Sequence, residues 1–259
     1  MKGLELFLHS VRQVTGNLDG ALRVSALPIL IQTVVVLLFM GGAMMGMGGP
    51  GAMAGGGMGM GAGMGLGMLI VMVVAVVTSL WLAVAWHRYV LLNEQPQGFV
   101  PPYNGERMMG YFGRSLGYGL IVVIAGAVLG TIIGSLLSPL LSGGGVVVFL
   151  ILMAVLVQLP MIYLAFRLTT ALPGSAVGSG LPFMAGWEAT KGASADILVL
   201  SAIAVGAHLV LAVLGFLIFD RIPVVSILWN VAVTWLVTMV GVSILTTLYG
   251  HYIEKRPLV

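Results

Sequence analysis

The sequence predicts an all-α polytopic membrane protein with six transmembrane helices and amphipathic interfacial helices on the cytoplasmic side. Charged residues make up only 7% of its 259 residues, whereas a soluble domain has about 25%. Hydrophobic residues make up 59%, the mean hydropathy is +1.12, and six apolar runs are each long enough to cross a bilayer. The 11 basic and 8 acidic side chains cannot cover a water-facing surface of this size. Most of the outer surface is therefore expected to face lipid.

Net charge and cysteine content narrow the partners and sites that can be expected. The net charge is only +3, and we interpret the basic excess as an orientation signal, so no nucleic-acid partner is predicted. The absence of cysteine excludes disulfides and thiolate metal sites without identifying the compartment. No resident cofactor is predicted.

The six spans are expected to belong to a single integral membrane domain covering residues 1–259. Pro28 lies near the start of the first span, where its missing N–H has no helical partner. The fourth span is the clearest, because its length of about 34 Å suffices for a bilayer core with some tilt. The spans are predicted at about residues 25–45, 65–86, 116–137, 146–168, 196–219 and 224–249.

Three amphipathic segments precede pairs of spans. Residues 4–18 place apolar side chains on one helical face and charged side chains on the other. This segment is expected either to lie in the membrane interface or to pack on the bundle as an ordinary helix. Asn104 can cap a short interfacial helix before the third span, and Pro182 can start another that ends near Gly192.

Residues 41–67, between the first two spans, consist mainly of glycine, methionine and alanine. Glycine at this density costs too much backbone entropy for a packed element, so we expect a flexible exterior loop. Thioethers are soft ligands that select Cu(I), so copper binding is one hypothesis and a low-complexity linker is the other. The methionines concerned are Met44, Met45, Met47, Met58, Met60 and Met64.

The positions of the basic residues predict the orientation. With six spans both termini share a side, and all of the Lys and Arg residues except Arg221 fall on that side. This bias predicts cytoplasmic termini and an exterior Gly/Met-rich loop, and the short turns and glycine-rich composition suggest a bacterial inner membrane. The basic residues on the predicted cytoplasmic side are Lys2, Arg12, Arg23, Arg88, Arg107, Arg114, Arg167, Lys191, Lys255 and Arg256.

Small residues at four-residue spacing predict close helix packing. Gly126, Gly130 and Gly134 form such a stripe on the third span, and Ala202 and Gly206 form a pair on the fifth. The pattern indicates close approach of another helix, from this chain or from a partner, and says nothing about chemistry.

Polar side chains at membrane depth are the main candidates for a functional site. Gln158 and His208 fall about halfway along the fourth and fifth spans, and Asn230 and Thr234 fall in the outer half of the sixth. Such groups usually face the protein interior. They either line a polar path or contact a substrate, or they form interhelical hydrogen bonds. No acidic residue lies at mid-depth, which argues against ion-coupled transport.

Aromatic and basic residues at the span ends are predicted to anchor the chain in the headgroup layer. For Arg167 two alternatives remain open: an ion pair with Asp196 that closes a hairpin, and snorkelling to lipid phosphate. The predicted anchors are Trp86, Arg88, Arg167, Trp187 and Lys191.

No nucleophile, nucleotide-binding or zinc-hydrolase motif occurs in a suitable setting, so the sequence predicts no enzyme. Glu94 and Glu106 lie near Arg107 and are expected to be solvated charges.

Two stretches carry a family resemblance. The run from Arg167 to Gly192 contains Leu-Pro-Gly-Ser-Ala-Val-Gly and Gly-Trp-Glu-Ala-Thr-Lys-Gly, and the run from Trp86 to Glu94 follows the second span. In these stretches and in its layout, the chain resembles uncharacterised six-span bacterial inner-membrane proteins. These include YciC-like proteins and the membrane domain attached to some glycerophosphoryl diester phosphodiesterases. We expect no phosphodiesterase catalytic domain, so the resemblance implies the topology and a non-enzymatic membrane role.

The sequence favours a scaffold or accessory protein that packs with membrane lipids, with a membrane-protein partner or with another copy. The alternative is a transporter or permease-like protein for a lipid or small solute. A water-accessible cavity that reaches His208 and Gln158 would favour that alternative, whereas a fully packed bundle would favour the scaffold. Copper handling by the exterior loop is the third hypothesis.

Overall fold

The computed structural model describes residues 2–46, 58–96, 98–219 and 223–258, without the side chains of residues 40–46, 58–64 and 223. These residues form an all-α bundle. Six helical segments are long and apolar enough to cross a membrane, which confirms the predicted fold class. They are Leu18–Phe39, Gly65–Leu92, Gly105–Leu137, Val146–Val177, Lys191–Phe219 and Val224–Tyr252.

The spans are built from both regular and irregular helices. Turns of π-helix lie within the fourth span and at the ends of the fifth and sixth. The α-helices are α1 Lys2–Thr15, α2 Leu18–Gly46, α3 Met58–Leu92, α4 Gly105–Leu137, α5 Pro139–Ser142, α6 Val146–Met153, α7 Leu159–Thr169, α8 Leu172–Val177, α9 Ala185–Ala189, α10 Ser194–Leu214 and α11 Pro223–Leu248. The other helices are η1 Ala154–Gln158, η2 Lys191–Ala193, η3 Gly215–Phe219 and η4 Tyr249–Ile253.

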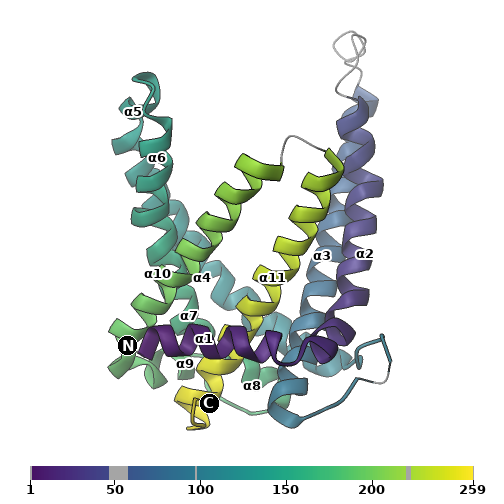
Figure 1. Cartoon of the computed structure of the whole chain (residues 1–259), viewed down its shortest axis with the longest axis vertical. Coiled ribbons are helices and arrows are strands. Elements are labelled where there is room, and N and C mark those ends of the chain that lie inside the picture. Colours follow the sequence, from purple (N-terminus) through teal and green to yellow (C-terminus); the bar gives the residue numbers. More distant parts are fainter. Residues whose placement is uncertain (1, 47–57, 97, 220–222, 259) are drawn as a thin grey trace.

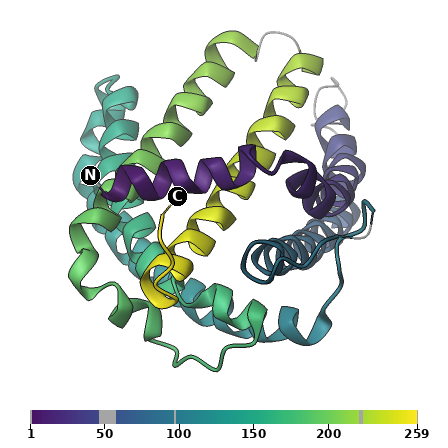
Figure 2. The same cartoon turned by 60° about the horizontal axis from the view of Figure 1, so that its bottom comes forward.

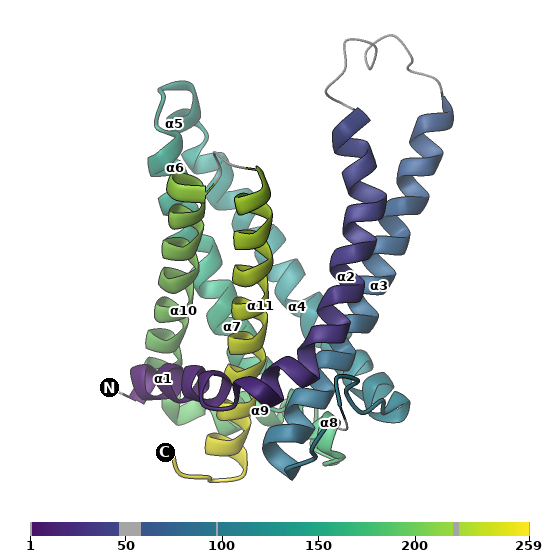
Figure 3. The ribbon, with the colours of Figure 1, turned by 45° about the vertical axis from the view of Figure 1, so that its right-hand side comes forward.

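Both ends of the chain lie at the same end of the bundle, together with α1, α8 and α9 (Figure 1). We call this the basal end. Here α1 lies crosswise against the basal parts of α10 and α11 and covers that side of the bundle (Figure 2). Toward the opposite end the α2–α3 hairpin leans away from α11 (Figure 3). The bundle is therefore closed at its base and splayed at its other end.

The crosswise position of α1 follows from its amphipathic sequence. Leu6 and Val14 are fully buried, and a Cβ on Gly3 would collide with the backbone of the first turns of α10. Leu4 and Leu8 lie on another face and stay 44% and 41% exposed. The helix thus packs on the bundle with one face, as one of the two predicted alternatives has it, and offers a second apolar edge to its surroundings.

Hydrogen bonds to hydroxyl groups of α11 connect α3 and α1 to it in the basal half of the bundle. The Trp86 indole of α3 donates to the Ser243 hydroxyl at 2.8 Å, and Ser10 of α1 donates to Thr247 at 3.0 Å. All four residues are at most 3% exposed. We call these contacts, with the His87–Thr246 contact described below, the α11 seam. In lipid there is no hydrophobic force between helices, so such contacts and close packing hold the bundle together.

A further contact lies one step farther from the base. Trp235 of α11 donates its indole N–H to the buried Ser25 hydroxyl of α2 at 2.8 Å. Leu82 and Met239 pack in the same layer with Val24, so α2, α3 and α11 share one apolar core here. Above this layer the α2–α3 hairpin separates from α11 (Figure 3).

Three element boundaries differ from those the sequence predicted. Helix α4 is continuous from the Asn104 cap, whose side chain accepts from the Arg107 N–H, to Leu137, so the expected short interfacial helix and the third span are one element. No proline interrupts this stretch. Its 33 residues span about 50 Å, more than the bilayer core. Near Pro182 only the short helix α9 forms, and residues 172–177, expected as loop, form α8.

The Gly/Met-rich segment is more helical than expected. Helix α2 continues to Gly46 and α3 begins at Met58, so only residues 47–57 of the predicted loop lie outside the described residues. In a membrane a helix satisfies its own backbone hydrogen bonds, which outweighs the intrinsic cost of glycine within these two paired spans.

We expect the α11 seam to be measurable as a coupling energy. Trp86→Phe removes the N–H that reaches Ser243, and Ser243→Ala removes its acceptor. A double-mutant cycle of unfolding free energies in detergent micelles should give about 0.6–1.7 kcal/mol of coupling, the range found for hydrogen bonds between membrane helices. Additive effects of the two substitutions would contradict the seam.

Candidate functional site

A cleft of about 430 Å³ lies between α10 and α11. The fourth span forms its back wall through Ile162 and Phe166, and Phe7 and Val11 of α1 line its basal end. Its walls are mostly aliphatic and aromatic. The cleft is therefore a largely apolar space that α1 bounds at the base, and we call it the α10–α11 cleft.

Gln158 reaches this cleft because of an irregularity in the fourth span. Pro160 has no N–H and its ring clashes with the carbonyl four residues before it, so a regular helix cannot pass through this point. At this point the chain forms the π-helical turn η1, which ends at Gln158. Such turns reorient side chains and recur at functional sites. The turn brings Gln158 into the lining of the cleft.

His208 of α10 also lines the cleft, and it is exposed, not buried as predicted. It lies about 21 Å along the helix from Ser194 at the base, which is close to mid-depth in a bilayer core. No hydrogen bond among the described residues involves the side chain of His208 or Gln158. Interhelical hydrogen bonds from these two side chains are therefore not seen in the described part of the chain.

The cleft has the chemistry of a binding site. An imidazole and an amide supply donors and acceptors within an otherwise apolar lining, which suits a molecule with a hydrocarbon body and one polar group. No nucleophile with an adjacent base lines it. Thr234, which was also predicted to be buried, is exposed and lines a different cleft on the other side of α11, together with Asn230.

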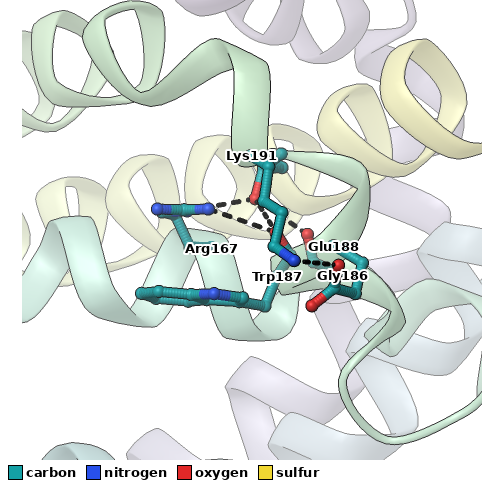
Figure 4. A network of polar contacts seen from close by, with 6 residues as sticks. Arg167, Gly186, Trp187, Glu188 and Lys191 are labelled. Carbon is teal, nitrogen blue, oxygen red and sulfur yellow. Dashed lines mark hydrogen bonds and ion pairs between the residues drawn. The ribbon is translucent and has the colours of Figure 1, made fainter.

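Arg167 lies in a network of neutral groups (Figure 4). Its guanidinium donates to Thr190 Oγ1 at 3.1 Å, to the Trp187 carbonyl at 3.1 Å and to Tyr163 Oη at 3.2 Å. A longer bond of 3.4 Å reaches Ser194, and the guanidinium also lies 3.8 Å from the centre of the Trp187 ring. Arg167 therefore joins α7, α9 and the start of α10.

Neither predicted alternative for Arg167 describes this network. Arg167 is only 6% exposed, so it does not snorkel to lipid phosphate. Among the described residues its hydrogen bonds go to hydroxyl and carbonyl oxygens and not to Asp196. The tight turn from α9 to α10 places several oxygens within reach of the planar guanidinium. The guanidinium can donate a hydrogen bond to each of them at the same time.

The other predicted interfacial anchors divide into inward and outward residues. Trp86 is fully buried in the α11 seam and therefore does not face headgroups. Arg88 is paired with Glu94 at 2.6 Å and donates to the Ala176 carbonyl of α8. Trp187 stacks on Arg167 as described. Lys191 is exposed and pairs with Glu188 at 2.5 Å.

Sequence reasoning missed the central position of His87. Its imidazole is fully buried, with Nδ1 2.8 Å from Thr246 Oγ1 of α11 and Nε2 3.2 Å from Tyr111 Oη of α4. It therefore links three spans. The sequence does contain an indication of this position. Trp86, His87 and Arg88 each carry a polar group, and consecutive residues of a helix point in different directions, so the three cannot all face the same environment.

The predicted packing glycines have different surroundings. A Cβ on Gly126 would lie 3.4 Å from Met161 Sδ, and one on Gly130 would lie 3.9 Å from Val157, so these two face the fourth span. Gly134 and Gly206 have open space, and Ala202 is exposed. Two of the three glycines in the α4 stripe therefore contact another helix of this chain. The pair on α10 faces outward.

The methionines of the copper hypothesis lie where side chains are not described. Met47 is outside the described residues, and Met44, Met45, Met58, Met60 and Met64 belong to helix ends whose side-chain positions are left open. Copper binding stays a prediction. In the described part of the chain no group of three or more His, Cys, Asp or Glu side chains could hold a metal ion.

Comparison with known proteins gives no further guide to this site. No protein-family model, curated protein or solved structure matches the chain. The resemblance to six-span bacterial inner-membrane proteins therefore stays a prediction, and function has to be argued from the geometry.

We expect Arg167→Lys to destabilise the basal end. A single ammonium cannot reach the oxygens of Thr190, Trp187 and Tyr163 together, so buried acceptors lose their partners at about 1–3 kcal/mol. Thermal unfolding in detergent should therefore occur at a lower temperature. The matched variant Lys191→Arg, at a 63% exposed side chain, should unfold like the wild type. Equal melting of Arg167→Lys and the wild type would contradict a structural role for the network.

The glycine stripe offers a comparison within one helix. Gly126→Leu adds a side chain against Met161 and should destabilise the bundle by about 1–3 kcal/mol through overpacking, whereas Gly134→Leu enters open space. Thermal unfolding of both variants checks this. Equal losses at both positions would mean that α4 does not pack on the fourth span through Gly126.

Proposed function

We propose that this membrane-spanning helical protein is a non-enzymatic transporter or permease-like protein that takes a lipid or small hydrophobic solute into the α10–α11 cleft. The observation that carries this proposal is that Gln158 and His208, from different spans, line the same largely apolar cleft. A volume of about 430 Å³ lies within the range of small-molecule sites.

Several features support uptake from the membrane. Large apolar side chains stay exposed on the upper parts of α10 and α11, among them Val213 and Leu228, so hydrocarbon can reach the cleft from the side. The base is closed by Phe7 and Val11 of α1. A hydrocarbon body would lie along the apolar walls, and its polar group would meet Gln158 or His208.

A scaffold role is the second candidate. Gly126 and Gly130 are occupied by packing against the fourth span, so they offer little to a partner. Ala202 and Gly206 instead face away from the described helices, and a helix of a partner or of a second copy could approach there. Assembly through this pair is compatible with a ligand in the cleft.

The proposed location is a bacterial inner membrane with both termini in the cytoplasm. Support comes from the basic residues, because the positive-inside rule assigns their side to the cytoplasm. Lys2, Arg12, Arg167, Lys191 and Arg256 all belong to basal elements. The splayed end of the bundle would then belong to the outer leaflet.

The cleft can be tested by filling it. Ala204 lines the cleft, whereas Ala202 on the same helix does not. In lipid nanodiscs containing a photoactivatable fatty acid, Ala204→Trp should lower crosslinking to α10 and α11 severalfold, because the indole occupies the space. Peptide mapping of the crosslinked protein measures this.

Ala202→Trp is the matched control and should leave crosslinking in the cleft unchanged. If it alone alters the oligomeric state in mild detergent, the scaffold role gains support. Equal crosslinking of wild type and Ala204→Trp, with both folded by circular dichroism, would contradict lipid uptake through this cleft.

A further inference from the structure

A second cleft lies on the other side of α11, between that helix and the α2–α3 hairpin, and has a volume of about 330 Å³. The Trp235–Ser25 hydrogen bond and the buried side chain of Leu82 bound it toward the base. It coincides with the part of the bundle where the hairpin leans away from α11 (Figure 3). We call it the hairpin cleft.

Half of the residues that line the hairpin cleft are polar, and none of them carries an ionisable side chain. Amides come from α2 and α11, and hydroxyls come from all three helices. The polar residues of the lining are Gln32, Thr33, Thr78, Ser79, Asn230, Thr234 and Thr238. By position along α11, Asn230 to Thr238 cover the middle and outer part of the span, where lipid hydrocarbon would otherwise lie.

Most of these hydroxyls lack the hydrogen bond to their own helix that is common elsewhere in the spans. Elsewhere in the spans a Ser or Thr hydroxyl commonly donates to the carbonyl four residues earlier, as Ser25, Ser201 and Thr246 do. Thr78 does so as well, and its hydroxyl also lies 3.5 Å from Gln32 Oε1. No hydrogen bond among the described residues involves the hydroxyls of Thr33, Ser79, Thr234 and Thr238.

Unpartnered hydroxyls at this depth imply an occupant that can form hydrogen bonds. A hydroxyl left without a partner in an apolar setting costs about 1–3 kcal/mol on the protein scale, and intrahelical acceptors were within reach of each one. Lipid chains cannot supply partners. The absence of ionisable groups in the lining argues against an ion or charged solute, because nothing there would balance its charge.

We propose that the hairpin cleft binds a neutral molecule with several hydroxyl groups. Alternating hydroxyl and amide groups match the mixed donor and acceptor character of a polyol, and the Ile29 and Val231 side chains can cover its carbon skeleton. Such hydroxyls come either from a free polyol or from the glycerol of a neutral lipid. This proposal does not rest on the function proposed for the α10–α11 cleft.

Single cysteines test the proposal in a chain that has none of its own. Thr234→Cys places a thiol in the cleft, and Ala232→Cys places one on the exposed face of α11 at nearly the same depth. In nanodiscs a charged methanethiosulfonate should label Thr234→Cys at least about tenfold faster, because hydrocarbon excludes charge. Thr238→Cys is the second cleft variant, should Thr234→Cys fail to fold.

Ligand protection separates the two sources of hydroxyls. Free erythritol added to the buffer should slow labelling of Thr234→Cys severalfold if a soluble polyol is bound. Monooleoylglycerol added to the bilayer should do so if a neutral lipid is bound, and neither should change labelling of Ala232→Cys. Protection by one of the two supports the proposal and identifies its source.

Three outcomes would overturn the proposal. Equal labelling of the cleft and control cysteines would show a dry groove. Fast labelling that neither compound slows would show a groove that holds water only. Slow labelling that quickens when an oligomer dissociates would show that a helix of another chain covers the hydroxyls.

Discussion

The structure depends on the α11 seam, where Ser243 and Thr246 hold α3 and Thr247 holds α1 to the centre of the bundle, while His87 of α3 also contacts α4. In water such contacts would add little to a hydrophobic core, but in lipid the apolar faces of helices gain nothing by meeting each other. Hydrogen bonds that have no alternative partner then decide which helices stay together. Because the seam lies at the base, the spans are fixed there and free to diverge above it.

This arrangement makes α11 a divider between two clefts of different chemistry. On one side the lining is apolar apart from Gln158 and His208, and on the other it is uncharged and rich in hydroxyls. Both clefts have closed basal ends, one through α1 and the other through the Trp235–Ser25 contact. The bundle is thus packed at one end and divided at the other, and each of the two proposed ligands has its own cleft.

Arg167 shows how the base is held together without an opposite charge. A buried cation usually requires a carboxylate, yet here hydroxyl and carbonyl oxygens and the Trp187 ring surround the guanidinium. These groups come from α7, from α9 and from the turn into α10, and the five-residue α9 and the three-residue η2 are too short to pack as independent helices. The arginine therefore orders a segment that has little hydrophobic surface of its own.

The sequence by itself determined the number of spans and their approximate positions, because hydropathy and helical rise depend only on residue order. It also indicated that Gly126 would meet another helix. Only the tertiary structure decided that Gln158 and His208 share a cleft while Thr234 lies in another, because that depends on the rotation of each helix about its axis. Apolar residues surround nearly every span, so no hydrophobic periodicity marks an inner face, and the few polar contacts between helices set those rotations.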